Sequence, residues 1–180
     1  MTETTFVADK TRGELRMHPA AKAERYEELL GQLASVLEGE TDLLAGMTSM
    51  VCLLHNAFPY FFWTGFYRRV AAEELLVGPY QGTLGCLRIP FSRGVCGTAA
   101  RERRTIVVPD VHLFPGHIAC DAASASEIVV PVFDVAGELI AVLDVDSTIR
   151  DAFDDTDQEW LERFVARLAP LAPHPVVSTS

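Results

Sequence analysis

The chain has 180 residues, of which 49% are hydrophobic, and its formal net charge is −10 at pH 7. This length and composition predict one globular domain and exclude a disordered chain. The negative charge disfavours partners such as nucleic acid and anionic membranes, because both would be repelled by this surface.

The N-terminal segment, residues 1–18, is polar and is expected to be flexible. It lacks the apolar stretch of a secretory signal peptide. Apolar runs elsewhere fall short of the roughly 20 residues that a membrane-spanning helix needs. We therefore expect a cytoplasmic protein with reduced thiols. A single domain is predicted over residues 19–172, followed by a flexible tail over residues 173–180.

Two helices are predicted at the start of the domain. Apolar residues recur at helical spacing over residues 22–37. A second helix is expected to begin at Thr41 or Asp42, since both residue types cap helix N-termini well. Cys52 falls inside this second helix among aliphatic neighbours, which predicts an inert, buried thiol.

Strand patterns dominate the middle of the chain. Strands are expected at residues 60–70, 73–82, 86–91, 105–109, 127–135 and 138–147. A short helix is expected at residues 94–104, and its charged end, residues 101–104, is interpreted as solvated. Because hairpins connect these strands, a purely parallel sheet is excluded. The pattern predicts an α+β fold, with a central antiparallel β-sheet flanked by helices.

A last helix is predicted after a capping box formed by Thr156 and Glu159. Its apolar face is expected to contain Trp160, Leu161, Phe164, Leu168 and Leu171.

Residues 110–126 form a long loop without predicted regular structure, and such loops are usually functional. The loop contains His112, His117, Cys120 and Asp121. These residue types can bind a metal, but their spacing matches no common site, so no metal is expected. His117 is left with two interpretations, activation of a thiol or a structural part in the loop.

Two strands are expected to present chemically distinct faces, because side chains alternate along a strand. One face of the last strand is predicted to turn from apolar to acidic along Ile140, Val142, Asp144 and Asp146. One face of the first strand contains Trp63, Gly65 and Tyr67. The glycine either leaves room for a ligand or belongs to an aromatic core patch with a bulge.

Several segments resemble the free methionine-(R)-sulfoxide reductases, which are single-domain enzymes with a GAF-like fold. The segments are FFWTGFY, GPYQGTLGCLRIPFSRGVCGTAA, VPDVHLFPGHIACDAASASEIVVPV and GELIAVLDVDS. The resemblance extends over residues 58–164 and includes Cys86, Cys96 and Cys120 in matching contexts. A GAF sensor domain would share the fold without these thiols. The additional Cys52 and the longer polar ends depart from the pattern without touching the motifs.

The resemblance implies thiol-dependent reduction of free L-methionine-(R)-sulfoxide through a cysteine sulfenic acid and an intramolecular disulfide. It implies that Cys120 is the nucleophile, Cys86 the main resolving thiol and Cys96 a second or relay thiol. Cys96 also lies at the expected start of the 94–104 helix, where the helix dipole would lower the pKa of its thiol. The resemblance implies an external dithiol donor such as thioredoxin, no bound cofactor, and pairing into a homodimer.

The acidic residues Glu127, Asp144 and Asp146 are expected to share one pocket with Trp63 and Tyr67, in agreement with the resemblance. Mutual repulsion would keep at least one carboxyl protonated, able to donate to the sulfoxide oxygen. Ionised carboxylates would bind the substrate ammonium, and the aromatic rings would enclose its methyl group. Two alternatives remain, a non-enzymatic GAF module that binds a small ligand and a redox sensor. Turnover beyond one equivalent separates an enzyme from both.

Overall fold

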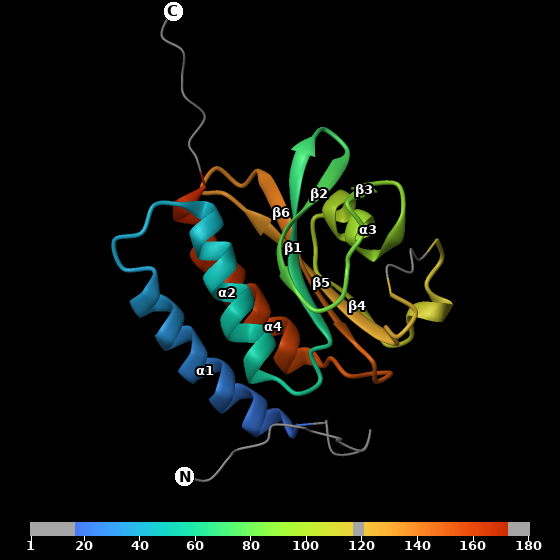
Figure 1. The fold of residues 1–180 in the computed structure, drawn as a ribbon, viewed down its shortest axis with the longest axis horizontal. Helices are drawn as coiled ribbons and strands as arrows, with labels where there is room; N and C mark the ends of the chain where they lie inside the picture. The colour runs from blue at the N-terminus through green and yellow to red at the C-terminus, as the bar shows by residue number, and fades with distance from the viewer. Residues whose placement is uncertain (1–16, 117–120, 173–180) are drawn as a thin grey trace, which may run out of the picture.

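The centre of the protein is a six-stranded sheet in the order β3-β2-β1-β6-β5-β4, with antiparallel pairing between all neighbours (Figure 1). The computed structural model describes residues 17–116 and 121–172. Its strands are β1 (Trp63–Ala71), β2 (Glu74–Gln81), β3 (Arg88–Pro90), β4 (Ile106–Val108), β5 (Ser126–Phe133) and β6 (Leu139–Ser147). The predicted α+β fold with a central antiparallel sheet is confirmed.

Helices cover both faces of this sheet (Figure 1). One face packs against α1 (Pro19–Val36), α2 (Leu43–Ala57), α4 (Asp155–Val165) and the 3₁₀ helix η2 (Ala166–Leu171). The opposite face packs against α3 (Gly94–Glu102) and the 3₁₀ helix η1 (Val111–Leu113). Among these helices, none combines the length and the apolar character needed to cross a membrane. The sheet therefore separates two hydrophobic clusters.

The helix starts follow from aspartate caps. The Asp42 carboxylate accepts the Ala45 N–H at 2.8 Å, which selects Asp42 over Thr41 as the cap of α2. The capping box of α4 is formed by Asp154 and Asp157, so its prediction at Thr156 and Glu159 is wrong. The shorter aspartate side chain at the third position can also reach back to the cap N–H, which the Glu/Gln pattern overlooks.

The apolar face predicted for the last helix is buried, but its residues belong to two elements. Trp160, Leu161 and Phe164 lie in α4, whereas Leu168 and Leu171 lie in η2. The 3₁₀ helix contains Pro170, which has no N–H to continue an α-helical ladder.

A buried ionic network joins α1 to the start of α4. Lys22 is 3% exposed and its ammonium contacts Asp157, which is fully buried, and Asp154. The Tyr26 and Tyr60 hydroxyls donate to the other Asp157 oxygen at 2.9 and 2.6 Å. All these polar atoms have partners, so the charged pair can remain inside the domain.

Two predictions about side-chain direction are wrong. Cys52 is exposed, because the buried stripe of α2 runs through Met47, Met50 and Leu54, and Cys52 lies outside it. Ile140 does not share a face with Val142. The register between β5 and β6 shifts beside Val132. Ile140 therefore packs with the hydrophobic cluster on the opposite sheet face, which α1, α2 and α4 cover.

Candidate active site

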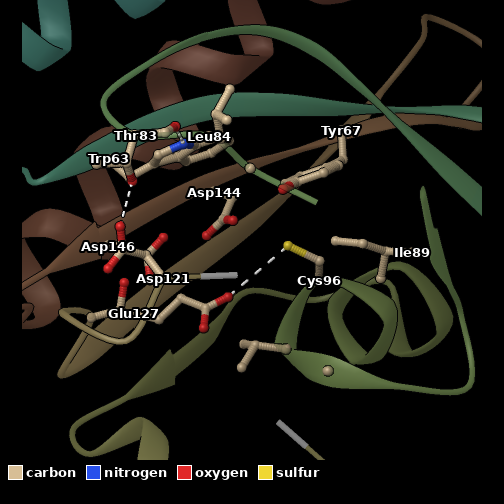
Figure 2. A pocket seen from close by; sticks show the side chains of 14 residues that line it. Trp63, Tyr67, Thr83, Leu84, Ile89, Cys96, Asp121, Glu127, Asp144 and Asp146 are labelled. Atoms are coloured by element: carbon tan, nitrogen blue, oxygen red, sulfur yellow. Dashed lines mark hydrogen bonds between the residues drawn. The ribbon is translucent and has the colours of Figure 1, made fainter. Parts of the chain in front are cut away.

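A cavity lies on the sheet face that packs against α3 (Figure 2). Its lining residues are Trp63, Tyr67, Thr83, Leu84, Gly85, Ile89, Gly94, Val95, Cys96, Asp121, Ser124, Glu127, Asp144 and Asp146. Four of these have carboxyl groups, and the described lining contains no lysine, arginine or histidine. The cavity therefore favours a cationic ligand.

Strand register brings the acidic side chains together. Asp146 on β6 pairs with Trp63 on β1 and with Glu127 on β5. Two positions earlier on β6, Asp144 pairs with Gly65. Because side chains two positions apart share a face, the three carboxyls converge as predicted (Figure 2).

The environment of the three carboxyls favours their protonated forms. Burial, followed by the charges of Asp144 and Asp146, raises the pKa of Glu127 well above its usual value. Burial and the charge of Asp146 likewise raise the pKa of Asp144. Burial raises the pKa of Asp146 to about 7, although a hydrogen bond with Ser124 opposes the shift. The cluster can therefore contain both a carboxylic acid and a carboxylate near neutral pH.

Cys96 lies in the first turn of α3, where its thiol faces the acidic cluster (Figure 2). The thiol makes a long hydrogen bond of 4.0 Å to Glu127. Burial, and then the charges of Asp144 and Glu127, raise the pKa of Cys96 well above its usual value. The expected lowering by the helix dipole is wrong, because burial and the two carboxyls outweigh a partial charge at the helix end.

The aromatic wall is built as a stack. The Trp63 ring stacks with the rings of both Tyr67 and Tyr80, with centroid distances of 5.7 and 5.3 Å. A Cβ atom added to Gly65 would lie 2.3 Å from the Tyr80 Cβ and 2.5 Å from the Trp63 ring. Gly65 therefore makes room for neighbouring aromatic rings, which agrees with the core-patch interpretation, although the bulge beside Gly65 lies in the partner strand β2 and not in β1.

The predicted thiols occupy different settings. Cys86, in the β2–β3 connection, is half-buried and disulfide-bonded. Cys52 and Cys96 are free thiols. Cys120 and His117 lie outside the described residues. His112 is exposed in η1 and does not line the cavity.

One group of described residues has donor atoms close enough to contact a single cation. These atoms belong to Cys96, Glu127 and Asp144, and they lie within 4.8 Å of one another. The Oδ1 atom of Asp144 is buried without a hydrogen-bond partner among the described residues. The arrangement can accept an ammonium group or a metal ion, and it differs from the His112/His117/Cys120/Asp121 set considered from the sequence.

Sequence reasoning missed three polar residues of the rim. Thr83 donates a hydrogen bond to Asp121 (Figure 2). Ser124 hydrogen-bonds Asp146. The third residue is Asp121, which the sequence suggested only as a possible metal ligand and not as part of this rim. No periodic pattern marks these residues, because they lie in connections that meet only through the fold.

This chain is similar to a known domain family and to several known proteins. The GAF domain family matches residues 26–170. The free methionine-R-sulfoxide reductase of Escherichia coli is 44% identical, with 82% of this chain and 88% of that protein aligned. The enzyme of the same name from Saccharomyces cerevisiae is 43% identical, with 76% and 82% aligned. The structure of the free methionine-R-sulfoxide reductase from Neisseria meningitidis in complex with its substrate is 41% identical, with a TM-score of 0.78 over 95% of this chain and 96% of that one.

Proposed function

The chain belongs to the free methionine-R-sulfoxide reductases of the GAF domain family, which are oxidoreductases, and we propose that it reduces free L-methionine-(R)-sulfoxide with its own thiols. The observation that carries this proposal is the convergence of Glu127, Asp144 and Asp146 on one cavity beside Trp63 and Tyr67. A zwitterionic amino acid with a polar sulfoxide and a methyl group matches this combination of surfaces.

Substrate binding is assigned to the acids and the aromatic wall. An ionised carboxylate pairs with the free ammonium, for which the described lining offers no competing cation. The rings of Trp63 and Tyr67 enclose the methyl group and distinguish the two sulfoxide epimers. A peptide-bound residue lacks the ammonium and adds bulk, so the free amino acid is the preferred substrate.

The first chemical step transfers oxygen from substrate to enzyme. The Cys120 thiolate attacks the sulfoxide sulfur while a protonated carboxyl donates a proton to the oxygen. The S–O bond of the substrate breaks as the oxygen moves to the sulfur of Cys120, which leaves methionine with a reduced sulfur and Cys120 as a sulfenic acid. One thiol and one sulfoxide thus become one sulfenic acid and one thioether.

The second step forms a disulfide and releases the oxygen as water. The Cys86 thiol attacks the Cys120 sulfenic acid, and Cys96 serves as a second or relay thiol. The assignment of Cys86 is supported by its disulfide-bonded state, whereas Cys96 is a free thiol with a raised pKa. A low thiolate fraction makes Cys96 a slow nucleophile. An external dithiol such as thioredoxin then reduces the disulfide by exchange.

A turnover assay tests the proposal. The protein is supplied with a dithiol and either free L-methionine-(R)-sulfoxide, the (S) epimer or the N-acetylated (R) compound. We expect many equivalents of methionine from the first substrate and little reduction of the other two. Methionine limited to one equivalent would indicate a redox sensor, and equal rates on free and N-acetylated substrate would contradict the ammonium site.

A further inference from the structure

We propose that Thr83 and Asp121 are positioning residues that fasten the two cysteine-bearing connections to each other for disulfide formation. The inference rests on the proposed function, because it concerns the step in which Cys86 resolves the Cys120 sulfenic acid. It assigns a role to two residues of the cavity rim to which the proposed binding and proton-transfer steps assign none.

The hydrogen bond between these residues spans the two connections. The Thr83 hydroxyl donates to the Asp121 Oδ2 at 2.7 Å, across 38 positions of sequence (Figure 2). Thr83 precedes Cys86 by three positions, and Asp121 directly follows Cys120. Each reacting cysteine is therefore covalently close to one end of a single hydrogen bond.

Asp121 is itself held in place by its own segment. Its second carboxylate oxygen accepts the Ala123 N–H at 2.7 Å. Its main-chain carbonyl accepts the Ser124 N–H at 3.4 Å, and Ser124 is buried at the cavity. One carboxylate oxygen thus fixes the local turn while the other contacts the opposite connection.

Thr83 is held by the aromatic wall. Its carbonyl accepts the Trp63 indole N–H at 3.0 Å. Trp63 is in turn stacked with Tyr67 and with Tyr80. The hydrogen bond therefore holds Asp121 relative to a rigid part of the pocket, and not merely relative to another loop.

Such a contact acts on the rate and equilibrium of disulfide formation. In this step a Cys86–Cys120 bond forms, the sulfenic oxygen leaves as water, and no oxidant beyond the substrate is needed. The step is intramolecular, so its rate depends on the effective concentration of one thiol at the other. A charge-assisted hydrogen bond at an exposed site contributes modestly, and we expect about a tenfold effect on both rate and equilibrium.

The test compares Thr83→Val, which keeps the shape of the side chain but loses its donor, with Thr83→Ser, which retains the donor. Reduced proteins are mixed with one equivalent of free L-methionine-(R)-sulfoxide and quenched over time. Methionine, dimedone-trapped sulfenic acid and remaining thiols are measured. Separately, without substrate, the proteins are equilibrated in glutathione buffers to obtain the Cys86–Cys120 reduction potential.

We expect Thr83→Val to close its disulfide about tenfold more slowly once methionine has formed and to accumulate sulfenic acid, whatever its rate of methionine formation. Its potential should be about 30 mV more oxidising, which corresponds to tenfold in the equilibrium constant. Thr83→Ser should restore both values. Asp121→Asn should be intermediate, because an amide has one acceptor oxygen for two donors.

Unchanged closure rate and potential in Thr83→Val would overturn the proposal. The proposal would also be overturned if the closure rate and the potential both change in Thr83→Val and Thr83→Ser fails to restore them. The effect would then come from the side-chain environment and not from the hydrogen bond. These outcomes are independent of the proposed function. That function fails if the wild-type protein forms no methionine, whereas the glutathione equilibrium still tests the contact.

Discussion

Glu127 and Asp146 lie directly opposite each other on β5 and β6, with both side chains facing one cavity. Like charges directly opposite each other destabilise a sheet. Burial, together with neighbouring carboxylates, raises the pKa values of both groups. The fold thus contains an unfavourable pair at the site where the proposed reaction needs one protonated and one ionised carboxyl, and replacing it should change activity and stability in opposite directions.

The cysteine assignments are tested by single turnover. Cys120→Ser should form no methionine even in one turnover, because the nucleophile is lost. Cys86→Ser should give one equivalent and then stop, since the sulfenic acid lacks its resolving thiol. Quenched-flow measurement of methionine separates these results. Cys52→Ala is the matched control and should keep wild-type turnover and stability, because Cys52 is exposed. A stoichiometric burst from Cys120→Ser would refute the nucleophile assignment.

The acidic cluster should be required for catalysis while its replacement leaves the fold intact. Glu127→Gln, Asp144→Asn and Asp146→Asn should each lower kcat/KM by about 10²–10⁴-fold, as expected when a general acid or an ionic contact is lost. Circular dichroism checks that the variants are folded. Activity should survive exhaustive chelation. Near-wild-type rates in all three variants, or inactivation by a chelator with recovery on adding metal, would instead support a metal-dependent reaction.

The pH dependence of activity should have an alkaline limb, because the protonated carboxyl is lost as pH rises through its pKa. The charge of Asp146 helps to raise the pKa values of Glu127 and Asp144. In Asp146→Asn that charge is absent, so the two pKa values should fall. The residual activity of this variant should then decline at lower pH than wild type, by about one pH unit. The measurement is kcat against pH, and an unmoved or upward-shifted limb would contradict the coupling.

Stability should vary with pH in the opposite sense to that of a salt-bridged acid. Burial raises the pKa of Asp146 to about 7, so between about pH 4 and 7 the unfolded state loses a proton that the folded state retains. The contribution of Asp146 to the stability of the wild type therefore falls as pH rises through this window. Asp146→Asn should raise Tm by about 2–5 °C at pH 8 and by much less at pH 4. Thermal unfolding at both pH values tests this, with the exposed Glu38→Gln as a charge control. An equal change at both pH values would argue against it.

The aromatic stack should depend on Gly65. An added methyl group would meet Tyr80 and Trp63 at 2.3 and 2.5 Å, so Gly65→Ala must displace a ring. We expect a loss of about 1–3 kcal/mol in stability and about a tenfold rise in KM, with altered tryptophan fluorescence. Gly31→Ala, in α1 with no atom within 4 Å of the new methyl, should be stabilising by about 0.5–1 kcal/mol and kinetically silent. An unchanged KM in Gly65→Ala would contradict the assignment of Trp63 to substrate binding.

Local patterns predicted the elements because each depends on neighbours in sequence. The amphipathic helices, the β5–β6 hairpin and the shared face of Asp144 and Asp146 all follow from periodicity. The same reasoning misplaced Ile140, because a register shift beside Val132 interrupts the alternation and leaves no mark in composition. It also misplaced Cys52, since apolar neighbours in sequence do not say which helix face is buried.

The properties that depend on distant residues could not be predicted. The pKa of Cys96 is set by burial and by carboxylates on β5 and β6, whereas the sequence shows only a helix start. The Thr83–Asp121 hydrogen bond crosses 38 positions between two irregular segments. The residue types at the site are therefore readable from the sequence, but their protonation and mutual positions arise only in the folded sheet.

The buried ionic network also constrains when the domain can be completed during synthesis. Lys22 and Asp157 are separated by 135 positions. At ribosomal rates of about 5–20 residues per second, roughly 7–27 s pass between their appearance. During that interval the lysine of α1 has no carboxylate of α4 to neutralise it. Helix α1 can acquire its buried partner only once α4 has been synthesised, so nascent chains that stall before α4 should expose the apolar face that α1 otherwise covers.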